Sequence, residues 1–515
     1  MTERRHLKVG LICDSSVITP YVSELREWVD AQPGLEAWLR VRESDTRRWG
    51  SESFASQCAR RLVLGFEQWR YKRSAQYRTV RPVASAQPTA TDCERESDCD
   101  VLISFGPSPA DATRLPTTAA DVLCVGFGHG GESVDPWVAF QEVNAGEAKT
   151  CFSIRRISRS GGDAEVILNG AFPTQTYFVL SQAHLFKRSF QQIKGLLSKL
   201  ASGRPLVPSE LPFPSSAARS EAPRAHHWLG YLCRTMRRTI AGKVRSALRL
   251  EERWSVSYLD RPWQAASMHS GIEIDNPSKR YFADPFIVAD SDEVFCFVED
   301  YFDERRRGVI SVLKLGGGSH RFIGHALEED FHLSFPFVFE HDGRRFMCPE
   351  TNEARQIRIY ECLEFPLQWK LHSIAMQNVA AVDTMIFPHG DRWWMLTNLD
   401  SSGVGEYGSE LHLFYSDDPL DANWIAHPQN PLRVDPEFAR NAGMLRDGTA
   451  VFRVAQARGF GSYGVHTTIF QIEHLDVDHY REHAMKMLTP TFKSGISGTH
   501  HFHGNAGYST WDQKR

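Results

Sequence analysis

The feature that most constrains this chain is a repeat of roughly 50 residues in its C-terminal half. Residues 282–300, FADPFIVADSDEVFCFVED, align with LSFPFVFEHDGRRFMCPET further along the chain. Pro285 and Glu299 recur 51 residues later as Pro336 and Glu350. Each copy contains an apolar strand, a tight turn and a second apolar strand, which is the pattern of a β-hairpin.

Two further copies extend the repeat. VDTMIFPHGDRWWMLTN places Asp383 and Asn398 at the positions of the first copy's acids, and RNAGMLRDGTAVFRVAQ places Asn441 and Gln456 there. A further strand-like run follows every copy, for example GVISVLKL or QIRIYEC. Repeating units of three to four strands are typical of propeller blades.

The ends of this half supply strands for one more blade. WSVSYL at 254–259 precedes the first copy, and GTHHFHGNAGYSTW at 498–511 follows the last. A blade built from both ends closes the ring and removes exposed sheet edges. The sequence therefore predicts an all-β five-bladed propeller over residues 251–515.

Equivalent positions in the copies form two rings around the propeller axis, and both rings are mostly polar. The first consists of Asp284, Phe335, Asp383 and Asn441, and the second of Glu299, Glu350, Asn398 and Gln456. A buried carboxylate is costly unless it is paired or hydrogen-bonded, and clustered carboxylates shift one another's pKa values. The acids either form a functional cluster or cap strand ends and hold a central ion or water.

Paired carboxyl groups suit chemistry at a glycosidic bond, where one acts as acid and the other as base or nucleophile. We expect Asp284 and Glu350, assisted by Asp383, to be catalytic. The remaining polar ring residues, with aromatic and basic neighbours, are candidates for substrate binding: Glu299, Asn398, Arg440, Asn441, Gln456, Trp393, His466 and His500. The tail THHFHGN is a weak metal signal because alternate strand residues face opposite sides, and no metal site is predicted.

The N-terminal half has a different pattern. Buried-type strands at 7–13, 100–105 and 121–127 are separated by helical and turn segments. Strands that alternate with helices predict an α/β domain with a mostly parallel sheet, here assigned to residues 1–202.

Residues 203–250 link the halves. A Pro/Ser-rich stretch is followed by apolar residues every fourth position from Trp228 to Leu248, with Arg and Lys on the other faces. A basic amphipathic helix can lie on an anionic membrane, so residues 228–249 are a candidate for peripheral membrane contact. The alternative is a helix packed on its own protein with a solvated basic face.

Composition narrows the partners and the compartment. The 515-residue chain has a formal net charge of −4, which gives no drive toward nucleic acid. Ten cysteines form no C-x-x-C motif, which favours reduced thiols. We expect a cytoplasmic protein. If the basic helix binds lipid, the protein is peripheral to the inner membrane.

Residues 280–510 resemble the five-bladed propellers of the arabinanase, β-xylosidase and invertase type. They are more similar to the N-terminal domain of the plant glucosamine inositolphosphorylceramide transferase family, on the motifs YFADPF, HLSFPFVFEHDGRRFMCPET, LHLFYSDDPL and RNAG with FRVAQ. The resemblance implies a carbohydrate-related role in which Asp284 matches the hydrolases' base. Phe335 stands where a further acid would be expected, which favours transfer over hydrolysis.

Residues 121–175 contain GFGHGGESVDPWVAF and GGDAEVILNGAFPT. They resemble formyltransferases that use 10-formyltetrahydrofolate. The resemblance implies catalytic roles for His129 and Asp163, whereas Phe127 replaces the family's Asn.

Three functions follow. The leading hypothesis is a carbohydrate-active transferase that acts on a cell-envelope polysaccharide or glycolipid precursor at the propeller centre. The first alternative is 10-formyltetrahydrofolate-dependent N-formylation of an amino sugar by the N-terminal domain. The second is a non-catalytic glycan-binding scaffold.

Overall fold

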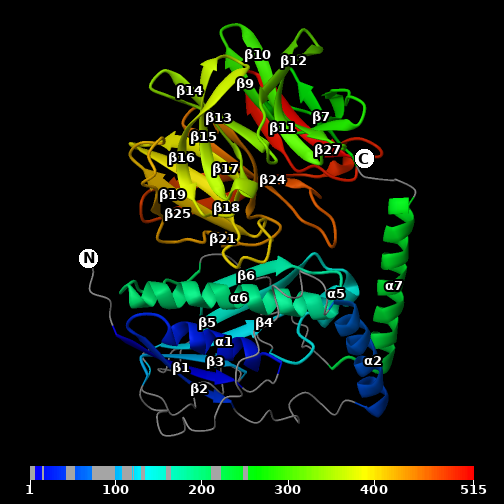
Figure 1. Ribbon diagram of the computed structural model, residues 1–515, viewed down its shortest axis with the longest axis vertical. Coiled ribbons are helices and arrows are strands. Elements are labelled where there is room, and N and C mark those ends of the chain that lie inside the picture. Colours follow the sequence, from blue (N-terminus) through cyan, green and yellow to red (C-terminus); the bar gives the residue numbers. More distant parts are fainter. Residues whose placement is uncertain are drawn as a thin grey trace. The chain divides into compact units, whose positions relative to one another are not determined.

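The computed structural model describes residues 6–13, 17–41, 53–71, 99–106, 119, 121–128, 134–157, 164–209, 222–247 and 253–515. The chain divides into two compact units, Met1–Arg245 and Ser246–Arg515, drawn in Figure 1 from blue to red along the sequence. Among the described residues, no helix is long and apolar enough to cross a membrane.

The first unit contains a six-stranded sheet in the order β2-β1-β3-β4-β5-β6. The pairs from β2 to β4 are parallel, and β5 and β6 join antiparallel, so the predicted α/β class with a mostly parallel sheet is confirmed. The elements are β1 (Leu7–Cys13), α1 (Thr19–Asp30), β2 (Leu35–Val41), α2 (Phe54–Tyr71), β3 (Val101–Phe105), β4 (Asp121–Phe127), α5 (Phe140–Ala145), β5 (Lys149–Ile157), β6 (Glu165–Pro173), α6 (Phe178–Ala201) and α7 (Ala225–Ala247).

Helices α1 and α6 pack side by side against this sheet (Figure 1). Phe186 of α6 contacts Tyr21 of α1 and Phe127 of β4 through edge-on ring pairs. Phe190 stacks on Phe105 of β3 at 5.0 Å. Aromatic pairs of this kind add to the free energy of burying their apolar area, so they anchor α6 on the parallel strands.

Helix α7 packs on the first unit by its N-terminal part. Trp228 is fully buried against Phe140 and Phe178, and the Tyr231 hydroxyl donates a hydrogen bond to the buried Glu67 of α2. Burial raises the pKa of Glu67. One face of the basic helix is therefore part of the protein core.

The second unit is a five-bladed propeller, as predicted. Blade one is β9 (Arg280–Asp290), β10 (Glu293–Phe302), β11 (Arg307–Gly316) and β12 (Ser319–Leu327), and blade two is β13 (Ser334–His341), β14 (Arg344–Glu350), β15 (Gln356–Glu364) and β16 (Gln368–Gln377). Blade three is β17 (Ala381–His389), β18 (Arg392–Leu399), β19 (Glu410–Ser416), β20 (Ile425–Ala426) and β21 (Arg433–Val434). Blade four is β22 (Arg440–Asp447), β23 (Ala450–Gln456), β24 (Thr467–Leu475) and β25 (Tyr480–Leu488), and blade five is β26 (Phe502–Asn505), β27 (Tyr508–Lys514), β7 (Trp254–Leu259) and β8 (Ile272–Glu273).

Blade five joins the two ends of the propeller segment, because β27 pairs with β7 across Trp511 and Ser257. The first strands of the blades, β9, β13, β17, β22 and β26, contact one another in sequence, and β26 returns to β9. The ring is thereby closed, and these five strands surround its centre.

Tight turns connect the first two strands of the blades. In blade two, Asp342 and Gly343 both have positive φ, 49° and 70°. Two consecutive residues with positive φ define the turn that matches the twist of a two-residue hairpin, which is why a D-G pair stands there.

Candidate functional site

The first strand of four blades is interrupted at the same point. The pairing between first and second strands breaks at Asp284–Pro285 in β9, at Phe335–Pro336 in β13 and at Asp383–Thr384 in β17. Asp284, Phe335 and Asp383 have φ of 47°, 48° and 51°. A left-handed bulge bends the strand and redirects a side chain, and residues in this unusual conformation concentrate at functional sites.

Blade four departs from the predicted register. The break in β22 falls between Asn441 and Met444, so Ala442 occupies the position of Asp383. In the second ring, Glu299 pairs with Ala283 and Glu350 with Ser334, while the blade-four equivalent is Ala455. The predicted ring members Asn441 and Gln456 are each one residue out, because the two ring positions are 13 residues apart in blade four (442 and 455) and 15 apart in blade three (383 and 398).

Four carboxyl groups from the first three blades converge. Glu299 and Glu350 interact electrostatically with Asp284, and Glu350 interacts with Asp383 by charge and hydrogen bonding. Burial, and then the neighbouring acids, raise the pKa of Asp284 to about 7 and that of Glu350 to about 8, and raise that of Glu299 well above its usual value. At neutral pH the cluster therefore holds protons that isolated carboxyls would have lost.

Two basic side chains face the acids. The Arg440 Nε donates to Asp383 Oδ2 at 2.5 Å, and the guanidinium lies over the ring of Tyr463 at 4.9 Å. Burial by itself would lower the pKa of Arg440, but Asp383, Tyr463 and Glu350 raise it overall. Arg440 therefore remains charged and pairs with Asp383.

His500 is the second basic side chain, and Asp512 holds it in place. His500 Nδ1 lies 2.5 Å from Asp512 Oδ2, and its Nε2 lies 3.5 Å from Asp284 Oδ1. Burial would lower the pKa of His500, yet Asp512 and Asp284 raise it overall. The three side chains form a chain from Asp512 through the imidazole to Asp284.

Sequence reasoning missed Asp512. It lies in β27, the second strand of blade five, and is fully buried. Its Oδ1 accepts the backbone N–H groups of His500 and His501, and its Oδ2 accepts that of Asp284. The signal in the sequence is STWDQK, which places an acid on the second strand of the fifth blade as well.

Three predicted substrate-binding residues instead hold blades together. The Asn398 amide donates to the carbonyls of Glu410 and Ala439, and its oxygen accepts the N–H of Asn441. The Asn441 amide donates to the carbonyl of Asp383, and Gln456 donates to that of Asn441. These side chains satisfy buried backbone groups between blades three and four.

Trp393 does not lie with the acids. It stands at the turn end of the β17–β18 hairpin, opposite Pro388, and packs on Phe339 and His341. Asn398, at the central end of the same strand, is five residues away, or roughly 17 Å in an extended strand. Trp393 is thus excluded from a site at the carboxyl cluster.

His466 directly precedes β24 in blade four. Its Nε2 lies 3.8 Å from Glu437 Oε1. Burial lowers its pKa. It lies near the same end of the blade as Arg440 but makes no described contact with the four acids.

Aromatic rings border the cluster. Tyr281 stacks on Tyr301 at 4.9 Å, and His332 approaches Glu299 at 3.6 Å. Trp254 stacks on His500 at 3.9 Å. Glu350, Arg440, Tyr463 and Tyr281 are only partly buried, so solvent reaches the cluster between these side chains.

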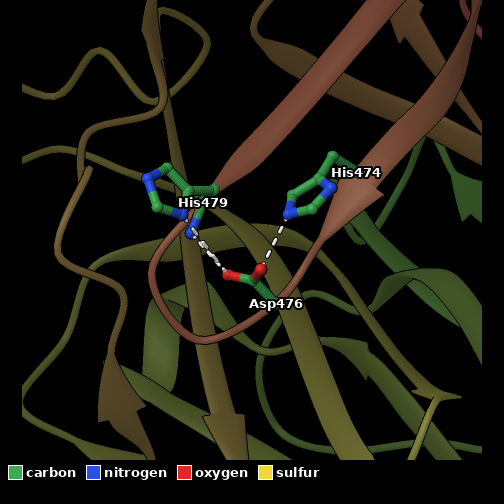
Figure 2. Close-up of side chains that lie close together, drawn as sticks. All are labelled: His474, Asp476 and His479. Atoms are coloured by element: carbon green, nitrogen blue, oxygen red, sulfur yellow. Dashed lines mark hydrogen bonds and ion pairs between the residues drawn. The ribbon is translucent and has the colours of Figure 1, made fainter.

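Two groups in the described residues have metal-ligand composition. In the first, Asp284, His500 and Asp512, the oxygens of Asp512 already accept hydrogen bonds from backbone and imidazole. The second, His474, Asp476 and His479, is exposed on the β24–β25 hairpin (Figure 2).

In the hairpin group, Asp476 Oδ1 accepts the N–H groups of Asp478 and His479, and Oδ2 lies 2.7 Å from His474 Nε2. This pattern is that of an Asp closing a turn on its own backbone. Both groups are accounted for without an ion.

The predicted N-terminal residues His129 and Asp163 lie outside the described residues. Phe127, which replaces the formyltransferase Asn, is fully buried beneath α6. The formyltransferase-like assignment, its folate cofactor and the N-formylation activity remain predictions.

Comparison with known proteins finds a sequence family that is similar to the propeller half. Residues 265–505 match the sequence family described as glucosamine inositolphosphorylceramide transferase 1, N-terminal. The predicted resemblance of the C-terminal half to this family is therefore confirmed.

Curated relatives agree. Glucosamine inositolphosphorylceramide transferase 1 of Arabidopsis thaliana is 35% identical over 209 residues, which are 39% of this chain and 27% of that protein. The protein of the same name from Oryza sativa subsp. japonica is 32% identical over 221 residues, 42% of this chain and 29% of that protein. The chain thus spans less than a third of the length of these relatives.

Among solved structures, the catalytic domain of the Coprinopsis cinerea GH62 α-L-arabinofuranosidase is similar at 11% identity, with a TM-score of 0.36, over 51% of this chain and 96% of that one. The identity and the TM-score are both too low for any conclusion on activity.

Proposed function

We propose that the carboxyl cluster at the propeller centre is the active site of a transferase that acts on the sugar of a glycolipid. The observation that carries the proposal is the convergence of Asp284, Glu350 and Asp383 with raised pKa values for two of them. The relatives that match this half are named glucosamine inositolphosphorylceramide transferase 1. Perturbed, mutually coupled acids of this kind are typical of catalytic sites.

Glu350 suits the role of general acid. Its carboxyl is protonated at neutral pH, and it is only partly buried, so a sugar oxygen can reach it. A proton donor whose pKa lies near the working pH balances availability of the proton against ease of transfer.

Asp284 suits the complementary role of base or nucleophile. The charged His500 lowers the pKa of Asp284 against the effects of burial and of Asp383, so a large fraction is ionised just above neutral pH. Asp512 accepts from both the imidazole and the Asp284 N–H, and thus positions His500 and Asp284 together.

Asp383 acts through its partners in this account. Paired with Arg440, it lies next to Glu350, and its charge and hydrogen bond raise the pKa of Glu350 and thereby keep the Glu350 proton bound. In an oxocarbenium-like transition state the same negative charge stabilises the sugar cation. Its fixed hydrogen bond to Arg440 means that this charge requires little reorganisation during reaction.

Transfer is favoured over hydrolysis by blade two. Phe335 stands at the ring position of Asp284 and Asp383, and packs against Phe286 and His501. An apolar ring at this position reduces the polar surface on which a hydrolytic water would be held.

The test is mass spectrometry of lipid-linked sugars and surface polysaccharide in host cells that lack this gene and are complemented with variants. Asp284→Asn and Glu350→Gln should fail to restore the missing species although they fold and accumulate normally. Asp292→Asn, on the exposed β9–β10 turn, is the matched control and should restore it.

Restoration by Asp284→Asn and Glu350→Gln would contradict catalysis at the propeller centre. If these variants also kept binding sugar, the result would favour the glycan-binding scaffold.

A further inference from the structure

Two helices of the first unit, α2 and α7, expose apolar side chains along one face. On α2 these are Phe54, Leu62, Phe66 and Trp69, which recur every three to eight residues opposite the buried face. Trp69 is 72% exposed and Leu62 is 70% exposed. A large aromatic that faces water on a helix otherwise packed by its other face marks an interaction surface.

Helix α7 repeats the pattern after its packed N-terminal part. Met236, Ile240 and Val244 continue the four-residue spacing that begins with the buried Trp228, but are 50%, 61% and 50% exposed. The helix leaves the protein core at about Thr235, which is still buried. Its apolar face thus runs on for more than two turns without a described partner side chain.

The charge on both helices has one sign. Helix α7 contains no Asp or Glu, and the only acid of α2 is Glu67, which is buried and hydrogen-bonded to Tyr231 of α7. Exposed cations on the two helices include Arg61, Arg70, Arg237 and Lys243. The Glu67–Tyr231 bond holds α2 and α7 in contact, so the two apolar faces and their cations lie on neighbouring helices of the first unit.

We infer that the exposed faces of α2 and α7 bind the surface of an anionic lipid bilayer. Exposed aromatic and aliphatic side chains enter the headgroup boundary, and the cations attract acidic lipids. Trp is the side chain best suited to this boundary because one end of its ring is apolar and the other polar. The inference extends the sequence-based expectation for residues 228–249 to a second helix, and it does not depend on the proposed sugar chemistry.

A protein partner fits these helices less well. The cations lie on both helices without exposed acids among them, whereas protein interfaces deplete charge at their centre. Each cation near an anionic bilayer surface contributes about fivefold to the partition coefficient.

The experiment is co-sedimentation of the full chain with vesicles of phosphatidylcholine alone and with one third phosphatidylglycerol. Binding is expected only to the anionic vesicles and should weaken as salt rises from about 0.1 to 0.5 M, because salt screens the attraction. Combined Arg61→Glu, Arg237→Glu and Lys243→Glu should reduce partitioning by about 100-fold. Combined Trp69→Ser and Ile240→Ser should reduce it at least tenfold while the thermal midpoint stays unchanged.

Matched controls come from the propeller. Met485→Ser with Met487→Ser removes side chains of similar exposure, and Arg321→Glu with Lys370→Glu reverses exposed charges. Both should bind like the parent. Equal binding by the helix variants and these controls, or no binding to anionic vesicles, would overturn the inference.

Two other results would also overturn it. If Trp69→Ser with Ile240→Ser lowered the thermal midpoint, the helix faces would be covered by another part of this chain. If the variant changed the oligomeric state instead, a second copy would be the occupant.

Discussion

In blades one, two, three and five, the second strand carries a polar residue near the carboxyl cluster. The partners of this residue in blades one and two differ from its partners in blades three and five. Blade three carries Asn398 and blade five Asp512, and each accepts a backbone N–H from the first strand of the next blade. Blades one and two carry Glu299 and Glu350, whose carboxyls interact chiefly with other acids. The polar residues of blades three and five join neighbouring blades, whereas those of blades one and two remain available for chemistry.

The difference shows how a closed propeller can contain a costly acid cluster. Asn398 and Asp512 satisfy buried backbone groups of their own blade and of the next one, which buried structure requires. The free energy of these hydrogen bonds helps to offset the burial of Glu299 and Glu350, which are acids without an equal number of cations. Substitution of an acid in blade one or two should therefore lower activity more than stability. Substitution of Asn398 should lower stability more than activity.

The largest expected effect is on activity. Glu350→Gln and Asp284→Asn should each lower glycolipid transfer by ~10²–10⁴-fold, because each removes a proton donor or acceptor in the transition state. Transfer is measured by mass spectrometry of the product, and circular dichroism checks the fold. Equal loss in Asp292→Asn would show that the effect is not specific to the cluster.

The second prediction concerns Asn398, the residue that joins blades three and four. Asn398→Ala leaves three buried backbone groups without partners and should cost ~3 kcal/mol of unfolding free energy. The thermal midpoint should fall by roughly 6–12 °C, whereas activity per folded molecule should change little. An unchanged midpoint with lost activity would move Asn398 into the substrate site and remove the distinction between the two pairs of blades.

The third prediction is a pH-dependent gain in stability. The pKa of Glu350 is raised from its usual value to about 8, so the folded state keeps a proton that the unfolded state loses above pH ~4.5. The free energy of unfolding therefore falls as pH rises between these values. Glu350→Gln lacks this loss, so it should match the parent at pH 4 and exceed it by ~4 kcal/mol at pH 8.

Thermal melts of Glu350→Gln and the parent across this pH range provide the measurement. A variant that is less stable than the parent at pH 8 would mean that the Glu350 carboxylate is stabilising.

The smallest predicted effect is a shift in the pH profile. His500→Gln removes the cation that lowers the pKa of Asp284, so the acidic limb of the activity profile should move up by about one pH unit. His503→Gln is the control, since His503 accepts the N–H of Ile287 and is not coupled to Asp284.

Much of the propeller could be predicted from its repeat, because strand, turn and acid recur at nearly constant spacing. Asp284, Glu350 and Asp383 were found in this way. The roles of Asn398, Asn441 and Gln456 could not be predicted, because an amide that binds sugar and one that binds a neighbouring carbonyl look alike in sequence. Trp393 was wrongly expected near the acids, because the repeat alone does not show that this residue lies at the turn end of its hairpin.

The most direct test of the account is the protonation state of Glu350, followed by infrared difference spectroscopy between the parent and Glu350→Gln as pH is raised. The account predicts a carbonyl band of a protonated carboxyl in the parent at neutral pH, absent from the variant, that disappears with a midpoint near the Glu350 pKa of about 8. If the band is missing at neutral pH, Glu350 is ionised there and the central acids do not form a coupled proton-holding cluster.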